Sequence, residues 1–347
     1  MDNRLRYVDF FDADTVYVNE SIKLDSLLVD KCKIKVVGND FSLNTCQVEN
    51  AIYFISDRKR KLKSNNYDEY IVVPGFSNPR WIIRNDANII NNQGNIIKPT
   101  SFLAYTVWEV AKFISKFDYM SLIFPNRIIA TSRSLEKNIL ANDSNSIGII
   151  YTGAKGEFQK FTLQVWHDSK SIVSYLKFGN QSQSRKKVGH EHHSLELLSK
   201  IKFDRVHIPK ILRFKLDSDH AMLETQNIVT GQDKKVDVLL NVDYLALLEI
   251  YNESGKKNTS VSEYINDKNI YKSVILDLLG ENFHVNISNS HGDYTPWNRF
   301  ILDNEVKIID WEDFSKRVMC YDLVTFLFSE GVLIKKSNLN KIQKKCE

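Results

Sequence analysis

The chain has 347 residues, of which 43% are hydrophobic and 26% are charged, values that are ordinary for a globular protein of two or three structural units. Its 47 Lys and Arg residues against 43 Asp and Glu residues leave a net charge of only +4, too little to indicate a nucleic-acid partner. The basic runs at 58–61 and 185–187 also lack the interleaved aromatic residues of a base-stacking surface, so no nucleic-acid partner is predicted.

The sequence shows neither the pattern of a signal peptide nor a C-x-x-C motif. Four of its first six residues are polar or charged, unlike the apolar core of a signal peptide, and no stretch approaches the roughly 18 uninterrupted apolar residues of a membrane span. The cysteines are too scattered for a zinc knuckle or a disulfide framework: Cys32, Cys46, Cys320 and Cys346. We therefore expect a cytoplasmic protein with reduced thiols and no membrane span.

In chain order, the pattern first predicts short strands separated by polar turns, at 15–18, 33–37 and 51–55. A helix is expected over 101–117, where apolar residues recur at helical spacing. The later elements are a strand-rich stretch over 147–178 with a glycine turn, a helix at 188–201, two strands within 210–226, helices at 236–253 and 260–281, a loop at 286–298, two strands within 299–310, and a helix from 321. Strands with one helix, followed mostly by helices, indicate an α+β fold of two lobes.

The strongest chemical signal is the segment 291–298, which reads HGDYTPWN, followed twelve residues later by Asp310. A kinase needs one carboxylate that orients the attacking hydroxyl and accepts its proton, and an amide oxygen and a second carboxylate that hold magnesium on the phosphates. Asp293 and Asn298 can lie at opposite ends of one loop, and a hairpin of 300–302 with 306–309 would return Asp310 beside Asn298. Either motif alone could instead be a turn or a strand end.

The two motifs resemble the H-G-D-x-x-x-x-N and I-D-W-E signatures of the aminoglycoside phosphotransferase and choline kinase family, over about 147–330. The resemblance implies a bilobal protein-kinase-like fold with ATP and Mg²⁺ as cofactors. It implies that Asp293 is the catalytic base and that Asn298 and Asp310 are the magnesium ligands. It also implies that His291 braces the loop and that Asp322 supports the loop from the following helix.

The nucleotide-binding residues are expected upstream of this loop. Gly153 and Gly156 lie in a glycine turn, where backbone N–H groups can approach phosphates, although a plain hairpin turn has the same pattern. Lys177 follows one strand later and is predicted to contact the phosphates. Glu191 is its expected partner, because it shares one helix face with two leucines at i+4 and i+7.

Two further segments have competing interpretations. The run at 190–193 (HEHH) lacks the i, i+4 histidine pair of a zinc site, so a polar first helical turn is the favoured interpretation. By resemblance, 221–226 is the hinge that holds adenine through its backbone, with Glu224 and Gln226 as positional candidates. A strand end without a ligand is the alternative.

Only eleven residues separate Asp310 from Asp322, too few for a long peptide-docking segment, so a small hydroxyl-bearing acceptor is favoured over a protein substrate. Three parts are predicted: a mostly-β accessory module at 1–125 for recognition or homodimer formation, a nucleotide-binding lobe at 126–226, and a helical lobe with the catalytic loop at 227–347.

The predicted activity is transfer of the ATP γ-phosphate to a sugar, an amino sugar or an amino alcohol, in a surface-glycan or metabolite pathway. Two alternatives remain open at this point. One is an aminoglycoside-resistance phosphotransferase, and the other is a catalytically inactive nucleotide-binding scaffold.

Overall fold

The structure is a computed structural model that describes residues 15–19, 33–37, 51–56, 67–76, 79–92, 102–117, 119–130, 140, 145–153, 156–234, 236–265 and 272–337. The chain divides into two compact units. The first comprises Met1–Arg185 with Asp217–Glu224, and the second comprises Lys186–Leu216 with Thr225–Glu347. Of the four cysteines, only Cys320 lies in the described residues, and it is a free, exposed thiol.

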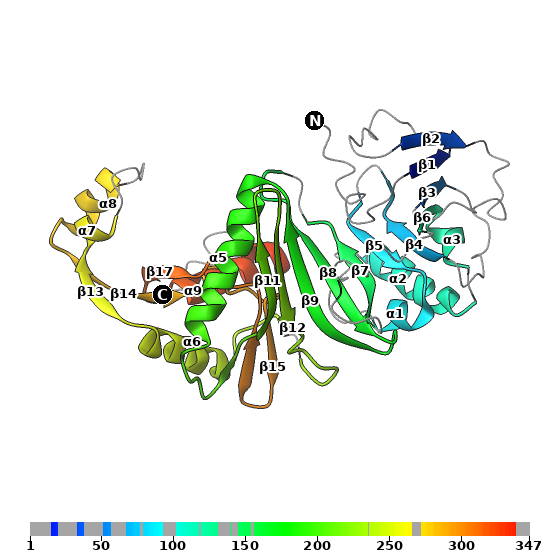
Figure 1. Ribbon diagram of the computed structural model, residues 1–347. Coiled ribbons are helices and arrows are strands. Elements are labelled where there is room, and N and C mark those ends of the chain that lie inside the picture. Colours follow the sequence, from blue (N-terminus) through cyan, green and yellow to red (C-terminus); the bar gives the residue numbers. More distant parts are fainter. Residues whose placement is uncertain are drawn as a thin grey trace. The chain divides into compact units, whose positions relative to one another are not determined.

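One large, mostly antiparallel sheet forms the first unit (Figure 1). Its strands are β1 (Thr15–Asn19), β2 (Lys33–Val37), β3 (Ala51–Ser56), β4 (Asp68–Val73), β5 (Trp81–Arg84), β6 (Asn126–Ala130), β7 (Asn145–Tyr151), β8 (Phe161–His167), β9 (Ser171–Gly179) and β12 (Ala221–Gln226). They pair in the order β12-β9-β8-β7-β5-β4-β6-β3-β1-β2. The predicted strands at 15–18, 33–37 and 51–55 are confirmed, and so is the α+β class.

The strands of this sheet bury side chains on both faces, because successive residues of a strand point to opposite sides. On β4, Tyr70 and Val72 belong to one core, whereas Ile71 belongs to another. Three helices pack into the second core: α1 (Ala87–Asn91), α2 (Phe102–Ser115) and α3 (Met120–Ile123). Trp108 of α2 is buried there, which confirms the helix predicted over 101–117.

Strand β6 joins residues on the two sides of position 125 into one sheet. It lies between β4 and β3, and its Ile128 shares a core with Val72 of β4 and Ile150 of β7. The buried pair of Arg127 and Glu69 also links β6 to β4. The three predicted parts, 1–125, 126–226 and 227–347, were defined by expected function. Their bounds stay a prediction.

The second unit contains most of helix α5 and two small sheets. Its helices are α5 (Ser182–Leu198), α6 (Asn241–Glu253), α7 (Val261–Tyr264), α8 (Lys272–Leu279) and α9 (Tyr321–Ser329), which continues as the π-helix η5 (Glu330–Ile334). Its strands are β10 (Val206–His207), β11 (Ile211–Leu216), β13 (Lys257–Ser260), β14 (His284–Ser290), β15 (Arg299–Leu302), β16 (Glu305–Ile308) and β17 (Ser315–Val318). The sheets have the orders β10-β16-β15 and β13-β14-β17.

Two predicted elements differ from the structure. The loop expected at 286–298 begins only after Ser290, because β14 continues through Ser290 and pairs with β17. The single helix expected at 260–281 is replaced by β13, α7 and α8, since Lys257–Ser260 pair with β14 and Ser260 then caps α7; residues 266–271 lie outside the described residues. Across the described part of the chain, no helix combines the length and the apolar character needed to cross a membrane.

Candidate active site

The loop 291–298 connects β14 to β15, and Asp322 at the start of α9 holds its first residues. One carboxylate oxygen of Asp322 accepts the His291 N–H at 2.8 Å, and the other accepts the Gly292 N–H at 2.8 Å. Gly292 has a φ of +88°, and a Cβ atom there would overlap the Asp313 carbonyl oxygen. Only glycine fits this backbone without strain.

The ring of His291 is fully buried and ties the loop to the end of β16. Its Nδ1 accepts the Asp293 N–H at 3.2 Å, and its Nε2 lies 3.0 Å from the Ile309 carbonyl oxygen, to which it donates. The ring also packs edge-to-face against Trp311, with 4.6 Å between centroids. Both ring nitrogens are therefore occupied by backbone groups, and the imidazole joins Asp293 to the residue that precedes Asp310.

Asn298 closes the loop from its other end. Its amide nitrogen donates to the Asp293 carbonyl oxygen at 3.0 Å and to the Asp293 carboxylate at 2.8 Å. Its backbone carbonyl accepts the Ile309 N–H at 2.9 Å. Since both amide hydrogens are used, the amide oxygen is the side-chain group left for an external ligand.

Electrostatics make this loop receptive to a cation. Burial is the main cause that raises the pKa of the Asp293 carboxyl above its ordinary value of 3.8, and the nearby Asp310 carboxylate raises that pKa further. The His291 ring and the hydrogen bond from Asn298 act in the opposite direction and lower that pKa. Two neighbouring carboxylates repel one another, and a bound cation removes that repulsion.

Asp310 belongs to a cluster of three carboxylates. It follows β16 with a φ of +67°, a left-handed conformation that is uncommon for a residue other than glycine. Carboxylate oxygens of Asp310, Glu312 and the buried Glu191 of α5 all lie within 4.8 Å of one another. Glu312 was not predicted as a site residue, although it stands in the same I-D-W-E segment.

Helix α5 is attached to residues 312–313 by two contacts. Lys187 forms an ion pair with Asp313, and His190 Nδ1 lies 2.9 Å from the Glu312 carbonyl oxygen. His192 instead stacks on Phe214, with 3.7 Å between ring centroids. The run at 190–193 thus lies in the middle of α5, which begins at Ser182, so the prediction that it forms the first helical turn is wrong.

The predicted glycine turn connects β7 to β8 in the first unit. Gly153 has a φ of +68°, and a Cβ atom there would approach the Lys160 carbonyl oxygen to 2.6 Å. Gly156 has a φ of +141°, with open space where its Cβ would stand. Because both residues have positive φ, a glycine is needed at both turn positions.

The predicted Lys177 lies on β9, directly opposite Thr162 of β8.

Pro79 and Arg80, just before β5, hold the start of this glycine turn. The Thr152 hydroxyl donates to the Pro79 carbonyl at 2.7 Å, and the Thr152 N–H donates to the Arg80 carbonyl at 3.1 Å. The Arg80 guanidinium reaches the Gly153 carbonyl at 3.3 Å. The segment before β5 therefore fixes the start of the turn.

The predicted roles of four residues stay untested, namely Glu224, Gln226, Lys177 and Glu191. Glu224 is buried on β12 and accepts a hydrogen bond from the Ser174 hydroxyl at 2.6 Å, so its carboxylate is used inside the unit. Gln226 is exposed, and its N–H donates to the Lys210 carbonyl at 2.8 Å. Lys177 belongs to the first unit and Glu191 to the second, so their ion pair stays a prediction.

The loop is also supported by a buried polar cluster that the sequence did not predict. The Tyr294 hydroxyl donates to Asp243 at 2.6 Å, and Arg299 Nε lies 3.0 Å from the same carboxylate. Burial and the Asp243 carboxylate raise the pKa of the Tyr294 hydroxyl well above its ordinary value, which keeps it protonated as a donor. Tyr294 and Arg299 flank the loop in sequence, but Asp243 lies 51 residues before Tyr294, and no local pattern connects them.

No family model matches the chain, and no curated protein matches it. Among solved structures, the chain is similar to an aminoglycoside phosphotransferase from Streptomyces rimosus, with a TM-score of 0.38 and 12% identity over 61% of this chain and 87% of the other. It is similar to amicoumacin kinase in complex with AMP-PNP and Ca²⁺ (TM-score 0.33, 14% identity, 52% and 63%) and to aminoglycoside 2′-phosphotransferase-IIIa in complex with GDP (TM-score 0.33, 16% identity, 57% and 80%). Because these TM-scores are below 0.5, they carry no argument about activity, and the function must be inferred from the residues of the site.

Proposed function

We propose that the chain is an ATP- and Mg²⁺-dependent phosphotransferase that moves the γ-phosphate to a hydroxyl group of a small molecule. One observation carries the proposal: a glycine-dependent loop holds Asp293 and Asn298 in direct contact, and its His291 ties the loop to the strand end at Asp310. The motif resemblance in the same segment agrees with this arrangement.

Each residue of the loop has a distinct part in the proposed reaction. Asp293 orients the acceptor hydroxyl and accepts its proton as the oxygen attacks the γ-phosphorus. Its raised pKa makes the ionised carboxylate more basic, and so a better acceptor for the proton of the acceptor hydroxyl. Asp322 and His291 do not touch the reacting atoms; they fix the position of the Asp293 backbone.

The oxygen ligands of the site fit magnesium. Carboxylate and amide oxygens are the hard ligands that Mg²⁺ prefers, and the Asn298 amide oxygen and the Asp310 carboxylate would hold it. Bound magnesium would neutralise negative charge on the ATP phosphates. Glu191 and Glu312 add negative charge within 4.8 Å of Asp310 and support its affinity for a cation.

The test is an acceptor screen with the full chain, ATP and Mg²⁺, in which ATP consumption is measured for sugars, amino sugars, amino alcohols and aminoglycosides. With the acceptor that the screen identifies, Asp293→Asn should lower kcat by roughly 10²–10⁴-fold, since a positioned general base contributes about that much. The matched control is Asp303→Asn, in the exposed turn between β15 and β16, where φ is +52° and Asn is tolerated.

Two results would overturn the proposal. One is undiminished activity in Asp293→Asn, and the other is the absence of ATP binding by calorimetry in the presence of Mg²⁺. ATP binding without turnover of any acceptor would favour the inactive scaffold instead. Turnover confined to aminoglycosides would select the resistance enzyme among the possible acceptor classes.

A further inference from the structure

Helix α2 carries apolar side chains on both of its sides. Trp108 and Ala111 are buried in the core that α1, α2 and α3 form with the sheet. On the opposite side, Tyr105, Val110 and Phe113 are exposed. A surface helix normally turns charged and polar residues outward, so the outer side of α2 has the composition of a buried face.

The apolar surface continues past the end of this helix. Phe117, in the turn after α2, is exposed and packs against Phe113 with 5.5 Å between ring centroids. Tyr119 and Leu122 are also exposed, before and within α3, which contacts α2 (Figure 1). We call the six residues the α2–α3 surface: Tyr105, Val110, Phe113, Phe117, Tyr119 and Leu122. Single exposed apolar residues are ordinary, whereas a contiguous group of this kind marks an interaction site.

The exposed area matches what a homodimer requires. The six residues are between 40% and 62% exposed. An aromatic side chain buries roughly 150–250 Å², so the six together offer on the order of 500 Å². A standard interface buries about 800 Å² on each partner, and about 65% of that area is apolar in homodimers. The α2–α3 surface therefore supplies the apolar part of one side of such an interface.

The charges of α2 are complementary to those of a second copy. Glu109 and Lys116 are both exposed, and they lie four residues before and three residues after Phe113. Glu109 pairs with Lys112 at 2.7 Å, and a carboxylate can accept further hydrogen bonds. Two copies of α2 that pack antiparallel about a two-fold axis near Phe113 bring Glu109 of each copy to Lys116 of the other. Opposite charges placed in this way fix the register of an interface.

We propose that the α2–α3 surface is the interface between two copies of this chain, which pack about a two-fold axis near Phe113. A lipid surface fits less well, because helices that lie on a membrane carry mostly Lys and Arg on their polar side, whereas α2 carries both signs of charge. The interface lies in the first unit and contains none of the residues proposed for phosphotransfer. Dimer formation requires neither ATP nor an acceptor, so its failure is separable from failure of the proposed function.

The first measurement is sedimentation velocity of the full chain over a range of concentrations. A dimer should form at micromolar concentrations, because interfaces of standard size bind with micromolar or tighter affinity. Phe113→Glu should weaken the dimer at least about 30-fold, the effect of removing a side chain at the centre of an interface. Because Phe113 is exposed, the variant should fold, which circular dichroism checks. A wild type that remains monomeric over this range would overturn the proposal.

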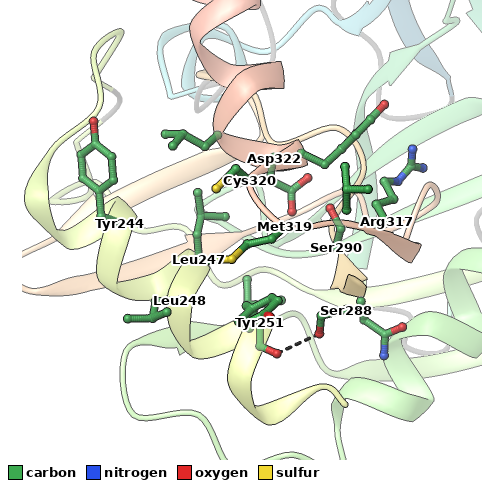
Figure 2. Close-up of a pocket in the computed structure, with 15 residues that line it drawn as sticks. Tyr244, Leu247, Leu248, Tyr251, Ser288, Ser290, Arg317, Met319, Cys320 and Asp322 are labelled. Carbon is green, nitrogen blue, oxygen red and sulfur yellow. Dashed lines mark hydrogen bonds between the residues drawn. The ribbon is translucent and has the colours of Figure 1, made fainter. Parts of the chain in front are cut away.

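The matched control is Leu248→Glu. Leu248 is 46% exposed on α6 of the second unit, where it lines a pocket of about 240 Å³ between α6, β14, β17 and α9 (Figure 2). The substitution places the same charge on a different apolar surface and should leave the dimer unchanged. Dissociation by Leu248→Glu but not by Phe113→Glu would move the interface to the second unit and refute the proposal.

Charge reversal tests the two-fold arrangement. Glu109→Lys and Lys116→Glu, made singly, each place like charges across the axis and should weaken the dimer about three- to ten-fold. The two reversals together restore opposite charges and should return most of the affinity. Lys112 is the same in the Glu109→Lys and double variants, so its contact with residue 109 does not account for the recovery. Weakening that adds up in the double variant would overturn the antiparallel pairing.

Cross-linking locates the axis. In Phe113→Cys, residue 113 of each copy lies beside its counterpart, so mild oxidation should link two peptides that contain this residue by a disulfide, as detected by mass spectrometry. Leu248→Cys carries the same native cysteines and should give no such link at residue 248. A stable dimer without the link at residue 113 would place the interface elsewhere. A monomeric chain that sediments with phospholipid vesicles would assign the surface to lipid, against the proposal.

Discussion

Asp322 controls the position of the candidate base although it does not reach the reacting atoms. Its two carboxylate oxygens each accept one N–H of the loop, from His291 and Gly292, so the chain direction entering Asp293 is fixed by a single side chain. Hydrogen bonds from backbone N–H groups to a carboxylate are charge-assisted and stronger than those to a neutral group. The start of α9 and the loop 291–298 are therefore held together by two such bonds.

Substitution of Asp322 by Asn should separate positioning from chemistry. The amide offers one oxygen where the carboxylate offers two, so one loop N–H loses its partner. We expect kcat to fall by roughly 100-fold, because small misplacement of a reacting group has costs of that size, while KM for ATP changes little. Steady-state kinetics measure this, with the exposed Asp277→Asn of α8 as the control. A parallel loss of ATP affinity would contradict a positioning role.

At the scale of elements, a buried ion pair attaches α6 to the strand that follows the loop. Asp243 of α6 and Arg299 of β15 have fully buried side chains, and Arg299 also donates to the Val238 carbonyl at 2.6 Å. Removal of one partner leaves an uncompensated charge in the interior. Asp243→Ala should therefore lower the free energy of unfolding by about 3–5 kcal/mol, measured by urea denaturation.

The double variant Asp243→Leu with Arg299→Met is the control for this pair. Since both charges are removed and the volume is largely retained, part of the lost stability should return, while the loss of the Tyr294 hydrogen bond to Asp243 persists. If the double variant is as unstable as the sum of the two single variants, the pair does not act as a unit.

A second ion pair should make part of the stability depend on pH. Burial acts to raise the pKa of Asp233, but hydrogen bonds from the Thr230 backbone and Lys307 outweigh it and lower the pKa below 3.8. Because the folded state favours the ionised carboxyl, this contribution is present above about pH 3.8 and is lost as the pH falls through the lower folded pKa.

Asp233→Asn is the matching variant. At pH 7 it should lower the free energy of unfolding by roughly 1–3 kcal/mol, the usual value of a hydrogen bond to a charged group. The difference from the wild type should shrink progressively below pH 3.8, as followed by urea denaturation at several pH values. A difference that does not vary with pH would show that the carboxyl charge is not what stabilises the turn.

How much of the site was predictable depended on the distance between its residues in the sequence. The spacing within 291–310 placed the loop beside Asp310, and the motif resemblance placed Asp322 against the loop. Asp243 was missed because its partners Tyr294 and Arg299 are some fifty residues away. The end of β14 was interpreted as a loop because Ser288, Asn289 and Ser290 are polar. Two of these side chains are satisfied by backbone carbonyls near α6, which no local pattern reveals.

At the scale of the whole molecule, the first unit depends on strands from both sides of residue 125. Residues of β3, β4, β5 and β6 share one core with residues of β7, β8 and β9. A chain that begins at residue 126 would expose the edge of β7 that pairs with β5 and one face of that core. We expect such a chain to aggregate, as measured by size-exclusion chromatography. A monodisperse product that still binds ATP would instead indicate a separable accessory module.

Other statements at this scale stay predictions, namely a cytoplasmic location, a homodimer and the part of residues 1–125 in acceptor recognition. The α+β class was predictable because strand alternation and helical spacing are local signals. The continuity of the sheet across residue 125 was not, because strand order depends on contacts distant in sequence.

The hydrogen bonds between the glycine turn and Pro79–Arg80 limit which sequence changes this protein can accept. The carbonyl of Gly153 and the N–H and hydroxyl of Thr152 are bonded to the segment that leads into β5. A change in the backbone path at 79–80, or loss of the Arg80 guanidinium, would therefore alter the shape of the turn without lying in it. Residues 79–80 and 152–153 should change together among homologues, and a front segment exchanged between homologues would have to bring its own turn with it.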